Sequence, residues 1–151
     1  MTFDGTTGPW LSIIGLGEDG RKALSPAALS LIQSAKLVVG GRRHLALVGD
    51  LPSNTMEWPT PLDAAIPDIL EYRGQPVVVL ASGDPFHYGV GVTLSRHLDD
   101  REFVSLPQPS AFSLAANRLA WGLQDTVLLA LNTRRVEILL PHLHSSSRII
   151  A

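Results

Sequence analysis

The sequence predicts an α/β protein built around a largely parallel sheet. Short apolar segments alternate along the chain with segments of helical periodicity. The most apolar of the strand-like segments, residues 75–81, lacks polar alternation, which is typical of a strand covered on both faces. With 151 residues, of which 45% are hydrophobic and 17% charged, the chain is long enough for one compact domain with a real core. Together these observations favour strands joined by crossover helices.

Glycine and proline punctuate the expected strands. Gly40-Gly41 ends the second strand, and Pro107 and Pro109 break the fifth. The strands are expected at residues 10–14, 37–39, 55–58, 75–81, 103–106 and 126–131, with a last one beginning at residue 148.

Start and stop signals mark the expected helices. Ser25 is a suitable N-cap with Pro26 at the first helical position, and Ser110 is the N-cap of a helix that Gly122 is expected to close. Pro67 either kinks its helix or marks the true start. Helices are expected over residues 26–35, 42–48, 63–72, 88–98, 110–121 and 136–142.

Composition excludes several classes of function. Twelve Lys and Arg against fourteen Asp and Glu give a net charge of -2, which argues against a general nucleic-acid binder. The absence of cysteine rules out disulfides, thiolate metal sites and a cysteine nucleophile. No apolar run approaches the roughly 20 residues of a membrane helix, and no secretory pattern is present. We therefore expect a cytoplasmic protein without membrane or nucleic-acid partners. His142 and His144 have no evident third ligand, so no metal site is expected.

Gly15, Gly17 and Gly20 form a G-x-G-x-x-G pattern after the first strand. This pattern is typical of dinucleotide binding, with the phosphates at a helix N-terminus. Here, however, the helix start signal at Ser25 comes five residues after the last glycine. A tight turn that only needs glycine, and a loop for a different ligand, are the alternatives.

The charged residues near this turn support two different interpretations. Glu18 and Asp19 place negative charge where a pyrophosphate would lie. Arg42 and Arg43, after the second strand, suit the 2′-phosphate of NADP, so an NADP-binding oxidoreductase domain stays open.

The segment Ser82-Gly83-Asp84-Pro85 follows the most apolar strand, at the sheet edge where α/β proteins collect ligands. Gly83 permits a close backbone approach, and Asp84 either caps a turn or faces a cationic ligand. Gly89 and Gly91 lie in the next expected helix, where each glycine costs about 1 kcal/mol relative to alanine. They indicate close approach of a ligand or another backbone, or a packing face of small residues.

Other polar groups follow the remaining strands. Ser110 and Ala111 expose N–H groups at a helix start, for capping, ligand contact or both. The basic clusters Arg42-Arg43-His44 and Arg134-Arg135 suit an anionic, carboxylate-rich substrate, or form a solvated surface.

Four segments in register resemble the tetrapyrrole methylase family, and most closely its precorrin-6Y and cobalt-precorrin-7 C5-methyltransferase branch in cobalamin biosynthesis. They span residues 14–17, 38–45, 80–89 and 109–119. The Gly83-Asp84-Pro85 segment is typical of the wider family. Gly40-Gly41-Arg42-Arg43-His44-Leu45, combined with Pro109-Ser110-Ala111-Phe112, indicates this branch.

The resemblance implies a two-lobed S-adenosylmethionine-dependent methyltransferase of the non-Rossmann kind, with the cofactor in the cleft between lobes. Residues 1–9 are then a flexible lead-in, and residues 10–131 the N-terminal parallel-sheet lobe. Residues 132–151 are a linker and the start of a C-terminal lobe, most of which is missing. The implied substrate is a precorrin or cobalt-precorrin macrocycle, and a homodimer is expected. An α/β scaffold fragment without a retained ligand site is the non-enzymatic alternative.

The resemblance also implies roles for individual residues. Asp19 and His44 are the candidates for the group that accepts a proton. At residues 130–134 the chain has Ala-Leu-Asn-Thr-Arg where the family often has Ser-Leu-His-Gly-Arg, so only the arginine carries over. The implied cofactor residues are Ser82, Gly83, Asp84, Tyr88, Gly89, Ser110 and Ala111, and the implied substrate residues are Gly15, Gly17, Arg42, Arg43, His44 and Arg134.

Overall fold

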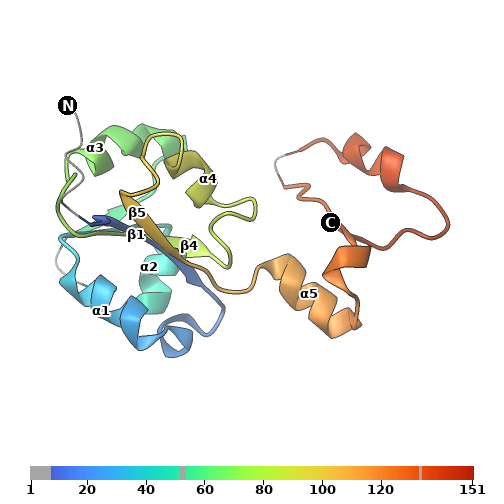
Figure 1. The fold of residues 1–151 in the computed structure, drawn as a ribbon, viewed down its shortest axis with the longest axis horizontal. Coiled ribbons are helices and arrows are strands. Elements are labelled where there is room, and N and C mark those ends of the chain that lie inside the picture. The colour runs from blue at the N-terminus through green and yellow to red at the C-terminus, as the bar shows by residue number, and fades with distance from the viewer. Residues whose placement is uncertain (1–7, 52–53, 133) are drawn as a thin grey trace. The chain divides into compact units, whose positions relative to one another are not determined.

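A computed structural model describes residues 8–51, 54–132 and 134–151. The chain divides into two compact units, the first ending at Gln108 and the second comprising Pro109–Ala151 (Figure 1). Each unit has its own sheet. The N-terminal lobe expected over residues 10–131 thus includes the sheet of the first unit and the beginning of the second.

The first unit is built on a five-stranded sheet in which every neighbouring pair is parallel, as the sequence predicts. The strand order is β3-β2-β4-β1-β5, so the first and fourth strands lie side by side near the middle. Gly15 is in register with Ala81, which brings the ends of these two strands together. The strands are β1 (Leu11–Leu16), β2 (Leu37–Gly40), β3 (Thr55–Glu57), β4 (Val77–Ser82) and β5 (Phe103–Leu106).

Helices cover both faces of this sheet (Figure 1). On one face lie α1 (Pro26–Ser34) and α2 (Arg42–Val48). On the other lie α3 (Ile66–Leu70) and α4 (Val90–Leu94). Two further short segments are 3₁₀ helices, η1 (Gly20–Ala23) and η2 (Leu62–Ala65).

A hydrophobic core lies between the sheet and each of the two layers of helices. Alternate residues of β4 enter different cores: Val78 and Leu80 pack with Ile32 of α1, whereas Val77 and Val79 pack with Ile69 of α3. Because side chains alternate across a strand, a strand buried on both faces must be apolar at every position. This explains the missing alternation in residues 75–81.

Local signals place several helix boundaries correctly. Ser25 caps α1, its Oγ accepting a hydrogen bond from the Ala28 N–H at 3.1 Å. Pro67 occupies the first turn of α3, so it marks the start of that helix. The helix expected over residues 88–98 is reduced to the five residues of α4: its start is delayed because Tyr88 has a left-handed φ of 56° and Gly89 is extended, and after Leu94 the chain continues as a turn.

The second unit contains α5 (Ala111–Leu119) and a sheet of two parallel strands, β6 and β7. Ser110 caps α5 as predicted, accepting from the Ser113 N–H at 3.2 Å. Gly122 does not close the helix. Ala120 does, with a left-handed φ of 53°, and the Trp121 N–H donates to the Ala116 carbonyl at 2.9 Å. The other elements are η3 (Leu123–Asp125), β6 (Val127–Leu128), η4 (Val136–His142) and β7 (Ile149–Ile150).

Strand β6 has two residues instead of the expected six.

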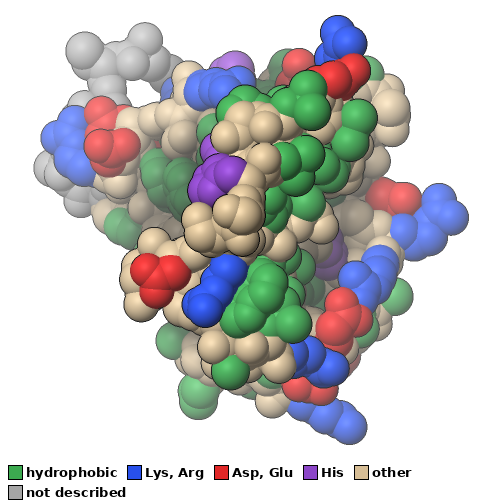
Figure 2. All heavy atoms as spheres, turned by 90° about the vertical axis from the view of Figure 1, so that its right-hand side faces the viewer, with side chains coloured by type: hydrophobic (Ala, Val, Ile, Leu, Met, Phe, Trp, Pro, Cys, Tyr) green, Lys and Arg blue, Asp and Glu red, His purple; other side chains and the backbone are tan. Residues whose placement is uncertain are grey.

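Hydrophobic side chains are exposed among arginines and histidines on the face drawn in Figure 2. Within the described parts of the chain, no helix is both long and apolar enough to cross a bilayer. The same residues contain no cluster of three or more potential metal ligands.

Candidate functional site

The carboxyl edge of the first sheet is closed by backbone hydrogen bonds between three loops. The Gly83 N–H donates to the Leu16 carbonyl at 2.8 Å, and the Gln108 N–H donates to the Gly83 carbonyl at 3.1 Å. Gly83, after β4, therefore joins the ends of β1 and β5. The sequence indicates a site at this edge, but it does not predict the contact that Gln108 makes with Gly83.

Glycine is required at position 15 by this arrangement. A Cβ on Gly15 would lie 2.0 Å from the Gly83 carbonyl oxygen and 2.7 Å from the Gln108 nitrogen. Both neighbours are backbone atoms that are already hydrogen-bonded to each other. A Cβ on Gly17 would meet no atom within 4 Å. The two glycines that the sequence groups together therefore differ: Gly15 permits loop closure, whereas Gly17 borders open space.

The third glycine of the motif does not open a helix that could bind a dinucleotide. Gly20 has a φ of 55°, and a Cβ there would lie 2.7 Å from the Leu47 carbonyl oxygen. It begins the short helix η1, while α1 starts six residues later at Pro26. Gly20 therefore allows the turn to approach α2, and the helix N-terminus expected for a pyrophosphate is displaced from the motif.

The segment after β4 is a rigid turn. The Asp84 carboxylate accepts a hydrogen bond from the Phe86 N–H at 2.9 Å, and the side chain is half-buried. A Cβ on Gly89 or Gly91 would lie 2.5 or 2.7 Å from the Pro85 carbonyl oxygen. These glycines are thus explained by a close backbone approach. The Tyr88 ring is 46% exposed and stacks on the ring of His87, with centroids 5.2 Å apart.

His44 and Ser82 are joined by a hydrogen bond that the sequence does not indicate. The Nε2 atom of His44 lies 2.8 Å from the Ser82 Oγ, although the residues are 38 positions apart. Burial lowers the pKa of His44 below 6.5, and the neighbouring Arg43 lowers it further. The Nδ1 atom is buried and has no hydrogen-bond partner among the described residues. Both effects favour the neutral form of the ring.

The two arginines of the basic cluster are exposed and paired with carboxylates. The Arg42 Nε lies 3.3 Å from an oxygen of Glu57, and Arg43 pairs with Glu18. Exposed pairs of this kind contribute about 0–1 kcal/mol, so another carboxylate can replace the protein's own at little cost. Asp19 lies at the start of η1, where its side chain is exposed and makes no capping hydrogen bond.

Three of the predicted site residues belong to the second unit. Ser110 is buried and caps α5, and Ala111 is the first residue of that helix. Arg134 lies after β6. Their roles in a shared site with the first unit remain predictions.

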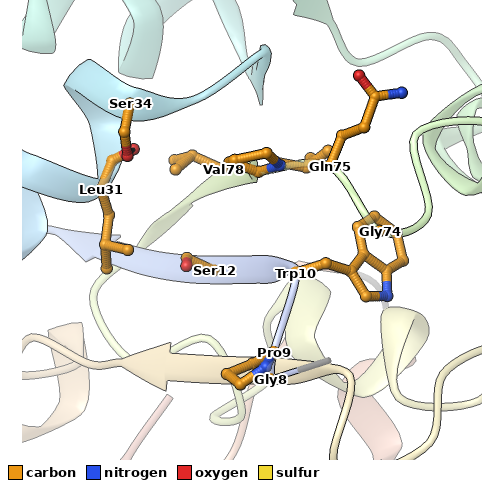
Figure 3. A pocket seen from close by; sticks show the side chains of 11 residues that line it. Gly8, Pro9, Trp10, Ser12, Leu31, Ser34, Gly74, Gln75 and Val78 are labelled. Atoms are coloured by element: carbon orange, nitrogen blue, oxygen red, sulfur yellow. Dashed lines mark hydrogen bonds between the residues drawn. The ribbon is translucent and has the colours of Figure 1, made fainter. Parts of the chain in front are cut away.

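A pocket that sequence reasoning missed lies at the opposite, amino edge of the first sheet. Its volume is about 320 Å³, and Figure 3 shows Leu31 and Ser34 of α1 at one end, near Ser12 of β1, and the Trp10 ring at the other end, beside Gly74. Its walls are largely backbone, apolar side chains and neutral polar groups, so no charged motif marked it. The full lining is Gly8, Pro9, Trp10, Ser12, Leu31, Ser34, Gly74, Gln75, Pro76, Val77 and Val78.

The fold and the sequence define one family. The model of the tetrapyrrole (corrin/porphyrin) methylases matches residues 11–146. The chain belongs to this family.

Individual relatives refine that assignment. The chain is 48% identical over 143 residues to precorrin-6Y C(5,15)-methyltransferase [decarboxylating] of Sinorhizobium sp, a match covering 94% of this chain and 35% of the relative. It is 32% identical over 126 residues to cobalt-precorrin-7 C(5)-methyltransferase of Salmonella typhimurium, covering 83% of this chain and 63% of the relative. The chain thus spans about a third of the first relative's length and under two thirds of the second.

A solved structure supports the fold. The precorrin-6Y methylase of Archaeoglobus fulgidus superposes with a TM-score of 0.68 at 27% identity. The match covers 85% of this chain and 68% of that structure.

Proposed function

We propose that this chain is part of an S-adenosylmethionine-dependent methyltransferase that methylates C5 of a precorrin or cobalt-precorrin macrocycle in cobalamin biosynthesis. The observation that carries the proposal is the 48% identity with the Sinorhizobium precorrin-6Y methyltransferase over 94% of the chain. The carboxyl edge of the first sheet, closed around Gly83, supports it as the place where ligands collect in parallel α/β sheets.

The side chains at this edge suit the cofactor. The Ser82 hydroxyl and the Tyr88 ring are exposed, and the Asp84 carboxylate is half-buried. A hydroxyl donor matches the carboxylate of an amino acid, a carboxylate matches its ammonium group, and an aromatic face suits an adenine ring. We propose that these residues, with Gly83 and Gly89, hold the cofactor, and that Ser110 and Ala111 complete the site.

The chemistry requires placement more than a reactive side chain. When bound, the cofactor supplies a methyl group attached to a sulfonium. The thioether that the sulfonium releases is a good leaving group. Holding two reactants in line can contribute about 7–11 kcal/mol, so the residues of the chain need only bind and orient. Arg42, Arg43 and Arg134 are proposed to bind the carboxylates of the macrocycle. Of the two candidate proton acceptors, His44 lies beside Ser82, whereas Asp19 is exposed on η1.

We further propose that the second unit is the beginning of the C-terminal lobe, since β6 and β7 form a sheet separate from the first. We also propose a homodimer, as the resemblance implies, and a cytoplasmic location. Light scattering after size-exclusion chromatography tests the dimer, and a monomer mass at every concentration would contradict it.

A calorimetric titration of S-adenosylhomocysteine, with NADPH in parallel, tests the proposed function. We expect saturable binding of S-adenosylhomocysteine alone, lost in Asp84→Arg because the variant removes the acceptor and adds like charge. Asp68→Arg, an exposed position on α3, is the charge-matched control and keeps binding. Binding of NADPH alone would support the dinucleotide alternative. Binding of neither compound would favour a scaffold and overturn the proposal for this chain.

A further inference from the structure

We infer that His44 is a positioning residue that acts through Ser82: the ring donates from Nε2 to Ser82 Oγ and leaves the hydroxyl proton of Ser82 to bind a carboxylate of the ligand. This inference deepens the proposed function and rests on it. It assigns the hydrogen bond donor at the carboxyl edge and names the group that donor recognises.

The backbone around both residues is fixed. Ser82 is the last residue of β4, directly before Gly83, whose N–H and carbonyl are both hydrogen-bonded across the edge. His44 lies in the first turn of α2, which follows Gly40 and Gly41. A Cβ on Gly40 would lie 3.5 Å from the His44 Cβ, so the helix closely approaches the end of β2. The 2.8 Å contact between His44 and Ser82 is therefore set by the sheet and by the start of a helix.

The surroundings of the ring decide which nitrogen carries the proton. The Nδ1 atom is buried without a partner, while Nε2 faces the Ser82 oxygen. A buried N–H group without an acceptor is rarer in proteins than a buried lone pair without a donor. A proton on Nδ1 would create such an N–H group. The favoured tautomer places the proton on Nε2, so that the ring donates and Ser82 accepts. Because the remaining lone pair is on the buried Nδ1, this tautomer makes His44 a positioning residue and not the proton acceptor.

This direction determines what Ser82 can recognise. A hydroxyl has one proton to donate and two lone pairs, and the ring occupies one lone pair. The hydroxyl proton remains available, and Ser82 is exposed at the edge where ligands are proposed to lie. Arg43, close enough to His44 to lower its pKa, adds positive charge nearby. A donor beside positive charge selects an anionic acceptor, and a carboxylate is the anion common to cofactor and substrate.

Two sources of that carboxylate are compatible with the geometry: the amino-acid part of the cofactor and the acid side chains of the macrocycle. Both present the same oxygen acceptor to Ser82. Two probe compounds distinguish these sources. The first, 5′-methylthioadenosine, keeps the nucleoside of the cofactor but lacks the amino acid. Uroporphyrin is a tetrapyrrole polycarboxylate that lacks the nucleoside.

The hydrogen bond direction is tested without any ligand. The ¹⁵N shifts of the His44 ring in the whole chain report which nitrogen is protonated. At pH 7.5 we expect a protonated Nε2 and an unprotonated Nδ1. A proton found mainly on Nδ1 would overturn the inference, whatever the protein binds.

Recognition of the carboxylate is tested by calorimetry on Ser82→Ala, with Ser30→Ala, an exposed serine of α1, as control. Losing a hydrogen bond to a charged group should weaken binding about 10- to 100-fold. If the cofactor supplies the carboxylate, Ser82→Ala should bind S-adenosylhomocysteine more weakly and 5′-methylthioadenosine with unchanged affinity. If the macrocycle supplies it, only the binding of uroporphyrin should weaken. Unchanged affinity for all three would overturn the inference and leave the proposed function intact, whereas binding of none by the unaltered chain overturns both.

Two substitutions of His44 separate positioning from simple packing. His44→Gln places an amide donor near the position of Nε2, so it should restore most of the affinity. His44→Asn has a shorter side chain that cannot reach Ser82, and should bind as weakly as Ser82→Ala. Combining Ser82→Ala with His44→Asn should add no further loss. Equal binding by the glutamine and asparagine variants, or fully additive losses, would contradict a role exerted through Ser82.

Discussion

Gly15 lies directly against the carbonyl of Gly83, so closely that a methyl group on Gly15 would lie 2.0 Å from that oxygen. The contact joins the end of β1 to the turn after β4, and the same carbonyl accepts the hydrogen bond from Gln108. The close approach of these three segments therefore requires that residue 15 has no side chain. Any residue larger than glycine must separate them, so the stability of this edge should be linked to the ligand binding proposed for it.

Gly15→Ala should destabilise the chain by about 1–3 kcal/mol, because the added methyl group meets backbone atoms that cannot rotate away. It should also weaken binding of S-adenosylhomocysteine by displacing Gly83. Gly17→Ala is the matched control, since its new Cβ meets nothing within 4 Å. Chemical unfolding and calorimetry measure both effects. Equal stability of the two variants would contradict the close packing of this edge.

Glu102 anchors the amino edge of the sheet. Its side chain is 4% exposed and binds Arg73 Nε at 2.7 Å, Trp10 Nε1 at 3.0 Å and the Asp99 N–H at 2.9 Å. Glu102→Gln loses the charge that strengthens these bonds and should cost about 2 kcal/mol. Glu71→Gln, on the exposed surface, is the control. Urea unfolding at pH 7 measures the difference, and a loss no larger than the control's would show that the cluster contributes little.

The same carboxylate should make stability depend on pH. Burial alone would raise the pKa of Glu102, but the hydrogen bonds from Asp99 and Trp10 and the charge of Arg73 lower it below 4.5. As the pH falls below 4.5, the unfolded chain binds the proton first, so the free energy of unfolding decreases until the folded pKa is passed. Glu102→Gln should show a shallower decrease between pH 5 and 3. An identical slope in both proteins would contradict this assignment.

Arg43→Gln should raise the pKa of His44. Burial is the main cause of the low pKa and persists in this variant, so only the part due to the nearby charge is recovered. Arg42→Gln is the control, because Arg42 is exposed, pairs with Glu57 and is no cause of the shift. NMR titration of the His44 ring follows both variants. A pKa that is unchanged in Arg43→Gln, or equally raised in both, would exclude this electrostatic coupling.

Arg42 and Arg43 should contribute more to macrocycle binding than to cofactor binding. Replacing both with glutamine removes two exposed cations that are proposed to exchange their own carboxylate partners for those of the ligand. Uroporphyrin, with several carboxylates, should then bind more weakly and with a smaller dependence on salt, while S-adenosylhomocysteine, with one, should lose less affinity. Arg96→Gln, an exposed arginine outside the cluster, provides the comparison. An equal loss of affinity for uroporphyrin and S-adenosylhomocysteine would contradict a role of the arginines in binding mainly the macrocycle.

Local features of this fold could be predicted from the sequence because their causes are local. Ser25 and Ser110 cap their helices through residues three positions away, and the unbroken apolar run of β4 reflects burial on both faces. Two helix boundaries were nevertheless predicted wrongly. The α4 helix starts two residues late, after the left-handed Tyr88 and the extended Gly89, and it ends at Leu94, four residues before the expected end. Gly122 carried the stronger stop signal, but Ala120 ends α5.

The candidate site was predicted as a location and not as a set of contacts. The expectation that ligands bind after β4 follows from the parallel sheet. The contact between Gly15 and Gly83, and the hydrogen bond between His44 and Ser82, depend on a strand order that places β4 beside both β1 and β2. Sequence patterns indicate glycine and histidine at useful positions, but not which partner each meets across the sheet.

We propose above that the cofactor binds at the carboxyl edge of the first sheet. Two-dimensional ¹H–¹⁵N NMR of the chain during addition of S-adenosylhomocysteine locates the binding site residue by residue. We expect the largest shifts at the amides of Gly15, Gly83 and Gly89. Shifts concentrated instead at Trp10 and residues 74–78, around the pocket at the amino edge, would contradict it.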